Sequence, residues 1–103
     1  IAQCLVGSEM CIRDRYMKYA TEVGEISLRT EPGVLTMYAV SEKENPRRIT
    51  ILETYASREA YESHVASEHF QKYKQGTLHM VKTLVLSDQT PLNPANRINN
   101  FIQ

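Results

Sequence analysis

The sequence predicts one α+β domain, and three observations carry this prediction. Apolar residues recur at spacings of three and four along residues 16–30, the period of a helix that buries one face. Residues 34–41 and 48–55 are rich in β-branched and aromatic side chains, which is typical of strands. Ser57 and Ser67 are then placed to begin two further helices. A chain of 103 residues has room for one such domain.

The first helix is expected over residues 16–30. Its inner stripe consists of Tyr16, Tyr19, Ala20, Val23, Ile26 and Thr30. On the outer face, Glu25 precedes Arg29 by four residues, the spacing of a favourable ion pair. Pro32 excludes helical geometry from Glu31, so the helix must end there.

The two strands following this helix should form a hairpin, because the polar run at 42–46 lies between them. The first is expected to point Val34, Thr36, Tyr38 and Val40 to one face of the sheet. Neither strand alternates cleanly between apolar and polar residues, so both faces should be covered. Because the chain has helices for only one face, we expect the other face to pack on a second copy in a homodimer.

Two further segments complete the predicted chain. Residues 80–87 are apolar on both faces and predict the last strand, whereas residues 91–103 contain prolines and many asparagines and are expected to be irregular. The order helix, strand, strand, helix, strand is that of a ferredoxin-like β-α-β-β-α-β unit without its first strand.

The segment expected to supply that first strand is residues 1–15. The run from Cys4 to Arg15 resembles a translated sequencing adapter, which predicts a non-native segment at 1–15, a domain at 16–90 and a tail at 91–103. A genuine strand over residues 1–6 is the alternative. Both cysteines, Cys4 and Cys11, fall inside the segment, so no disulfide or redox role is expected.

The composition excludes several classes of function. The 12 basic and 12 acidic side chains cancel, which gives no electrostatic reason to bind nucleic acid or an anionic membrane. No apolar run approaches the roughly 20 residues that span a bilayer. We therefore expect a soluble, cytoplasmic protein.

Three segments in succession resemble a known family: Glu31-Pro32-Gly33, Ile51-Leu52-Glu53-Thr54-Tyr55, and His64-Val65-Ala66-Ser67-Glu68-His69-Phe70. They are similar to the antibiotic biosynthesis monooxygenase (ABM) family, in particular to its quinol monooxygenase-like members. The resemblance covers residues 16–91. It implies a dimeric α/β barrel that oxidises a small quinol or phenol with dioxygen and uses no cofactor.

Three residues are candidates for the catalytic chemistry. His64 and His69 are candidate bases because an imidazole exchanges protons near neutral pH, and which of them acts is left open. Glu53 lies in mid-strand between apolar neighbours, where a carboxylate is either partnered or near a cavity. The structural alternatives are packing for His64, support of the Ser67 turn for His69, and an ion pair for Glu53.

Four residues are candidates for lining a substrate pocket: Tyr38, Tyr55, Met37 and Met80. The alternative for each is ordinary core packing. We expect no metal site, because five residues separate His64 from His69 and no third ligand is marked.

Three other functions are alternatives. Haem degradation is disfavoured, because the haem-degrading relatives use an asparagine, tryptophan and histidine set and this chain has no tryptophan. Isomerisation of a small phosphorylated carbonyl compound would need a phosphate clamp, for which Arg47, Arg48 and Lys82 are candidates. A dimeric module that binds a small ligand without catalysis is the third alternative.

Overall fold

The computed structural model describes residues 12–93 and confirms the α+β prediction. The expectations about residues 1–11 and 94–103 lie outside the described residues. The elements in chain order are α1 (Ile12–Thr30), β1 (Val34–Ser41), β2 (Ile49–Tyr55), α2 (Arg58–Ala66), α3 (Glu68–Thr77) and the short 3₁₀ helix η1 (Leu78–Met80). No helix in this part of the chain is both long and apolar enough to cross a membrane.

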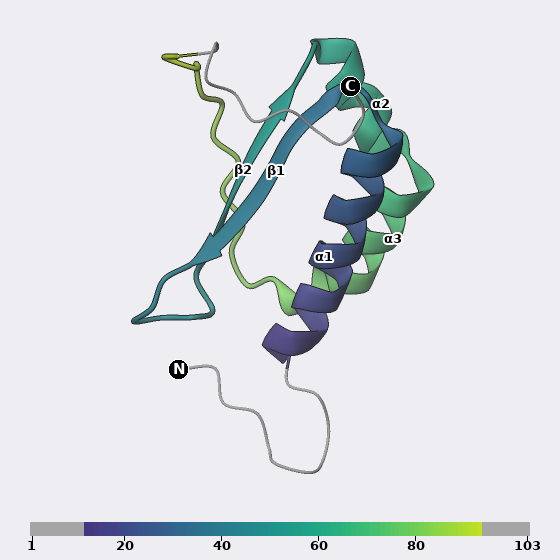
Figure 1. Cartoon of the computed structure of the whole chain (residues 1–103). Coiled ribbons are helices and arrows are strands. Elements are labelled where there is room, and N and C mark those ends of the chain that lie inside the picture. Colours follow the sequence, from purple (N-terminus) through teal and green to yellow (C-terminus); the bar gives the residue numbers. More distant parts are fainter. Residues whose placement is uncertain (1–11, 94–103) are drawn as a thin grey trace.

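The strands β1 and β2 form an antiparallel hairpin, and α1 and α3 lie side by side against one face of it (Figure 1). The predicted turn closes the hairpin, with the Glu42 amide donating to the Arg48 carbonyl at 3.1 Å. At the other end, α2 follows β2 directly. At this end a hydrogen bond joins Glu31, which directly follows α1, to His64 of α2.

The register of the hairpin corrects one prediction. Val34 is opposite Tyr55, but Thr36 is opposite Thr54, so an irregularity shifts the pairing by one residue between them. Because cross-strand partners point to the same face, Val34 faces the opposite way from Thr36, and the prediction that they share a face is wrong. Val34 is thereby turned toward the helices with Tyr55 and is completely buried.

The first helix begins earlier than predicted and buries a slightly different stripe. It starts at Ile12, four residues before the expected position, and the Arg13 Nε donates to the Pro46 carbonyl at 3.1 Å. Val23 and Ser27 are buried, whereas Thr30 of the predicted stripe is exposed. The expected ion pair between Glu25 and Arg29 is present at 2.7 Å.

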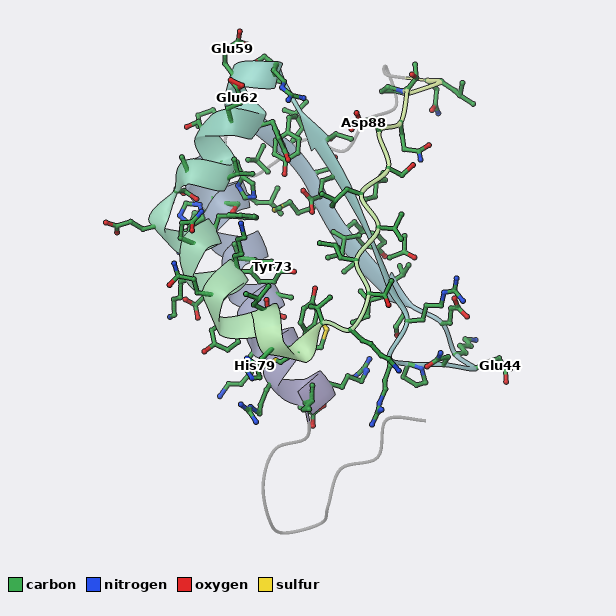
Figure 2. All side chains as sticks on the ribbon, turned by 180° about the vertical axis from the view of Figure 1, so that it is seen from behind. Glu44, Glu59, Glu62, Tyr73, His79 and Asp88 are labelled. Carbon is green, nitrogen blue, oxygen red and sulfur yellow. The ribbon has the colours of Figure 1, made fainter. Side chains whose placement is uncertain are left out.

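The predicted last strand at 80–87 is wrong. Residues 78–80 form η1, and the chain then runs without regular structure past the hairpin (Figures 1 and 2). A strand exists only when its amides and carbonyls have a neighbouring strand to pair with. Within residues 12–93, β1 pairs only with β2, and no strand pairs with residues 80–87. The apolar side chains of Leu84, Val85 and Leu86 are consequently exposed.

Candidate active site

The turn that follows α1 places Glu31. Pro32 keeps Glu31 out of the helix as predicted, and the Glu31 amide donates to the Ser27 carbonyl at 2.9 Å, which closes the last turn. The Val34 amide donates to the Glu31 carbonyl at 3.1 Å, so the chain enters β1 at once. Glu31 is therefore held by backbone hydrogen bonds on both sides.

Gly33 brings this turn against α2. A Cβ atom at Gly33 would lie 2.5 Å from the Cβ of Ala60, a distance that real Cβ atoms do not adopt. The Gly33 carbonyl also accepts a hydrogen bond from the Ala56 amide at 2.8 Å. Glycine is thus needed at position 33 because the backbone approaches α2 closely, and this approach carries Glu31 toward His64.

A break between α2 and α3 brings the two histidines together. In one continuous helix, residues five apart would point about 140° away from each other. Ser67 instead has an extended backbone, with φ −69° and ψ 154°, and ends α2 while it begins α3. Its hydroxyl donates to the His64 carbonyl at 2.6 Å and accepts from the Phe70 amide at 3.2 Å, which confirms the predicted cap. The centroids of the His64 and His69 rings are 6.1 Å apart.

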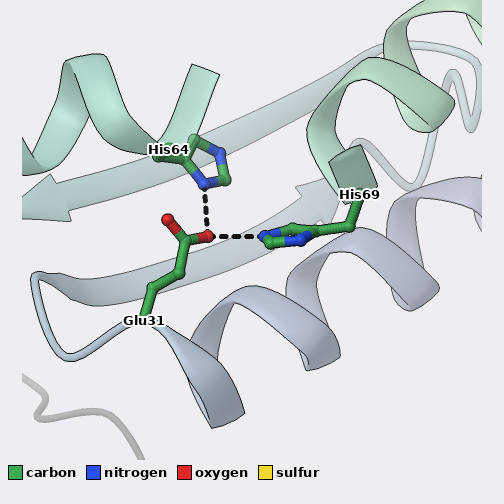
Figure 3. Close-up of side chains that lie close together, drawn as sticks. All are labelled: Glu31, His64 and His69. Carbon is green, nitrogen blue, oxygen red and sulfur yellow. Dashed lines mark hydrogen bonds and ion pairs between the residues drawn. The ribbon is translucent and has the colours of Figure 1, made fainter. Parts of the chain in front are cut away.

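One carboxylate oxygen of Glu31 joins both rings (Figure 3). Its Oε2 atom lies 2.9 Å from His64 Nδ1 and 2.6 Å from His69 Nε2. The side chain of His64 is 0% exposed, that of Glu31 16% and that of His69 18%. We call these three residues the Glu–His–His cluster. Its members come from three different segments of the chain.

The cluster determines where its protons lie. Burial acts to raise the pKa of Glu31, but the hydrogen bonds from His64 and His69 outweigh it and the net pKa is below the ordinary value. Glu31 is therefore ionised at neutral pH and accepts an N–H from each ring. With His64 protonated at Nδ1, its buried Nε2 is an acceptor, and this atom has no hydrogen-bond partner among the described residues.

A second polar pair adjoins the cluster. The Tyr55 hydroxyl donates to Glu53 Oε1, and the Tyr55 ring lies 5.5 Å from the His64 ring between centroids. Burial and the Glu53 carboxylate raise the pKa of Tyr55 far above its ordinary value, so this phenol remains a donor. Glu53 is exposed and takes Tyr55 as its partner, whereas the nearby Arg48 pairs with Glu42 at 3.1 Å.

The structure brings only some of the predicted pocket residues near the cluster. Tyr55 is in contact with it, but Tyr38 is opposite Leu52 on the other face of the sheet and is largely exposed. Met37 is opposite Glu53 and faces α1. Met80 ends η1, which follows the C-terminal end of α3, about 15 Å along the helix axis from His69.

An open groove of about 290 Å³ runs between α1 and β1. Its lining consists of Met17, Ala20, Thr21, Gly24, Glu25, Leu28, Met37 and Ala39. The groove is mainly apolar and extends along α1 to Leu28, three residues before Glu31. It includes Met37, one of the four residues expected to line a pocket.

Sequence reasoning missed Glu31 as a member of the site. The residue belongs to the Glu31-Pro32-Gly33 segment that carried the family resemblance, but it was interpreted only as the end of a helix. The signal that was available is the segment itself, because a carboxylate fixed by a turn is a good partner for a histidine. Glu31 lies 33 residues from His64 in the chain, so local sequence patterns do not indicate their contact.

A scan against protein-family profiles matches residues 13–76 to the family described as antibiotic biosynthesis monooxygenase. The chain belongs to the ABM family. The match contains all three residues of the Glu–His–His cluster, as well as Glu53 and Tyr55. A search of curated proteins found no match.

Two solved structures are similar to this ABM domain. A protein from Bacteroides thetaiotaomicron VPI-5482, classed with the antibiotic biosynthesis monooxygenases, is 56% identical, with a TM-score of 0.77 over 78% of this chain and 76% of that chain. A protein from Lactobacillus acidophilus NCFM, classed as a monooxygenase, is 30% identical, with a TM-score of 0.68 over 69% of this chain. The chain spans about a third of the second protein, with 34% of it covered.

Proposed function

We propose that this ABM domain oxygenates a small quinol or phenol without a bound cofactor, and that His69 is the base. The observation that carries the proposal is the Glu–His–His cluster, in which the ionised Glu31 holds both imidazoles. His64 is completely buried, whereas His69 retains partial exposure and can meet a substrate. Glu31 accepts the His69 Nε2–H, which leaves Nδ1 of His69 as the atom that accepts a proton.

The chemistry needs no external reductant. Removal of a hydroxyl proton from a quinol gives an anion rich enough in electrons to reduce dioxygen. One oxygen atom is then incorporated into the ring and the other leaves as water, so that one hydroquinone and one dioxygen give one hydroxyquinone and one water. Burial and Glu53 keep the Tyr55 hydroxyl protonated, but its one O–H is donated to Glu53, so it would have to exchange that partner to donate toward developing negative charge on a substrate oxygen.

Two of the three residues suggested for a phosphate clamp, Arg47 and Arg48, do not favour the isomerase alternative. Arg47 and Arg48 lie at the hairpin turn, and Arg48 is paired with Glu42. Tyr55 is the last of the seven residues of β2 and lies about 20 Å along the strand from them. Such a clamp would hold a phosphate far from the Glu–His–His cluster.

We also propose that the active form is a homodimer. The face of the hairpin turned away from α1 exposes Tyr38, Val40 and Leu52, at 61%, 51% and 53%. A row of large apolar side chains on one sheet face is unfavourable in water and is typical of a surface that a partner covers. A second copy of the chain would cover it with the same residues.

Oxygen uptake tests the proposed reaction. Metal-stripped, flavin-free protein should consume dioxygen with reduced naphthoquinones faster than the buffer does, and His69→Gln should slow this by about 10²–10⁴-fold. His79→Gln is the matched control, because His79 lies on η1 at the far end of α3 (Figure 2) and should leave the rate unchanged. A rate equal to autoxidation would exclude the oxygenase, and full activity in His69→Gln would exclude His69 as the base.

A further inference from the structure

We propose that the Glu–His–His cluster also binds a divalent transition-metal ion of the zinc or iron(II) class. The ligands are a carboxylate oxygen of Glu31, Nδ1 of His64 and Nε2 of His69. This goes beyond the proposed reaction, which uses no metal. The sequence predicts no metal site, because it indicates only His64 and His69 as ligands. The fold supplies a third ligand, Glu31, from the end of α1.

The positions of the three ligand atoms carry the proposal. They all lie within 4.8 Å of one another, with two of the three separations at 2.9 and 2.6 Å. Ligand bonds of about 2.0–2.2 Å place neighbouring ligand atoms about 2.8–3.6 Å apart around a zinc or iron ion, from octahedral to tetrahedral geometry. For one ion to bind all three groups, the carboxylate oxygen must move slightly away from both ring nitrogens, and the two nitrogens, which lie within 4.8 Å of each other, must move closer together.

The type and charge of the ligands select the class of ion. Two imidazoles and one carboxylate on one side of an ion are the ligand set of non-haem iron(II) sites, and the same set binds zinc. The ionised Glu31 supplies a negative charge in a mostly buried position, which an ion would neutralise. Magnesium and calcium prefer all-oxygen ligands and should bind poorly.

The cluster is also held in place before an ion arrives. Glu31 is fixed by the turn between α1 and β1, and Ser67 fixes the ends of α2 and α3 that carry the histidines. The partial exposure of Glu31 and His69 leaves one side open to an exchangeable ligand. When Nδ1 of His64 binds an ion, its proton moves to the buried Nε2, which has no partner among the described residues, and this weakens binding.

Metal binding and the proposed proton transfer exclude each other, because the ion replaces the two N–H hydrogen bonds to Glu31. Zinc should therefore inhibit oxygen uptake in proportion to its occupancy of the site. If the metal-stripped protein is inactive and iron(II) or cobalt(II) restores oxygen uptake, the metal site stands and the cofactor-free reaction is overturned. The two proposals can thus fail separately.

Titration of untagged protein with zinc and with cobalt(II) tests the site directly. The background is Cys4→Ser/Cys11→Ser, which removes thiolates that would bind either ion. We expect one ion per chain, binding weakened at least about 10-fold by Glu31→Gln or by His69→Ala, and unchanged binding in His79→Ala. Equal binding in all variants, or a loss confined to His79→Ala, would overturn the proposal.

Nuclear magnetic resonance of the protein with all its histidines intact tests the same site without variants that could misfold. Paramagnetic cobalt(II) should shift and broaden the imidazole signals of His64 and His69, while those of His79 stay in place. Signals of all three histidines that move together, or no shift at one equivalent of cobalt, would show that the cluster does not bind the ion.

Discussion

Two regions of this molecule differ in how completely a single chain buries their side chains and pairs their polar groups. At the closed end, the Glu31 turn, α2 and the start of α3 bury His64 and Val34 and join the Glu–His–His cluster by hydrogen bonds. Along the outer face of the hairpin and through residues 81–92, large apolar side chains remain in water. The closed end is formed by segments of one chain, whereas the outer face of the hairpin, here called the open face, has large apolar side chains that the described residues leave exposed.

The difference shows that the site depends on contacts within one chain, whereas the sheet also depends on further strands and a covered face. The cluster needs a turn and a helix break, which are local, and a close glycine contact between the α1–β1 turn and α2, which are far apart in the sequence but belong to the same chain. The sheet needs additional strands and a covered face, and the described residues supply neither. Four predictions test this contrast, from the largest expected effect to the smallest.

Substitution Gly33→Ala, at the closed end, should lower the stability of the protein more than the other three substitutions. The new Cβ would lie 2.5 Å from the Cβ of Ala60, and relieving this clash should lower the free energy of unfolding by about 1–3 kcal/mol. Gly24→Ala is the matched control, because a Cβ there meets nothing within 4 Å and should stabilise α1 by about 0.5–1 kcal/mol. Urea denaturation measures both. Ala60→Gly has its own helix cost of about 0.5–1 kcal/mol, so the double variant should lose less stability than the sum of the two single variants. Losses that simply add would mean that this contact is unimportant.

Substitution Glu31→Gln should remove an acid-sensitive part of the stability. The pKa of Glu31 in the folded chain is below the ordinary 4.5, so as the pH falls the unfolded chain takes up this proton first. The stabilisation is therefore present above about pH 4.5 and is lost as the pH falls through the lower, folded-state pKa. The variant should be less stable by about 1–3 kcal/mol at pH 7 and should lose less on acidification. Parallel pH profiles for the two proteins would contradict this explanation.

Substitution Leu52→Lys should act on the open face alone. A charge on this exposed position should weaken the proposed dimer by about 10–100-fold, or 1.4–2.7 kcal/mol, because its ammonium group would have to be buried. The stability of the monomer should change by less than about 0.5 kcal/mol. Sedimentation at fixed ionic strength measures the dissociation constant. Glu44→Gln, at the hairpin turn (Figure 2), is the control because it changes the net charge by the same +1. A wild-type chain that stays monomeric at high concentration would exclude the dimer.

Substitution Ser27→Ala should stabilise the closed end slightly. The Ser27 hydroxyl is completely buried in α1 and has no hydrogen-bond partner among the described residues. Its removal should raise the free energy of unfolding by up to about 1 kcal/mol, since no bond is broken. Ser63→Ala, at an exposed position in α2, corrects for the higher helix propensity of alanine. Thermal unfolding that gives the same gain for both would show that burial of the hydroxyl has no cost.

The local elements could be predicted from the sequence because their signals lie within a few residues of one another. The period of α1, the caps at Ser57 and Ser67 and the polar turn at 42–46 each depend on local backbone preferences. The predicted strand at 80–87 failed although its residues favour a strand, because β structure also needs a partner strand.

The sequence by itself therefore determined the helices, the hairpin and the family, including both histidines of the site. Only the tertiary structure decided which carboxylate joins them. Glu53 had appeared the better candidate, but it is bound by Tyr55, and Glu31 comes to the histidines from the end of α1. The physical reason is that a hydrogen bond depends on distance in space, and the Gly33 contact and the Ser67 break set this distance between segments far apart in the chain.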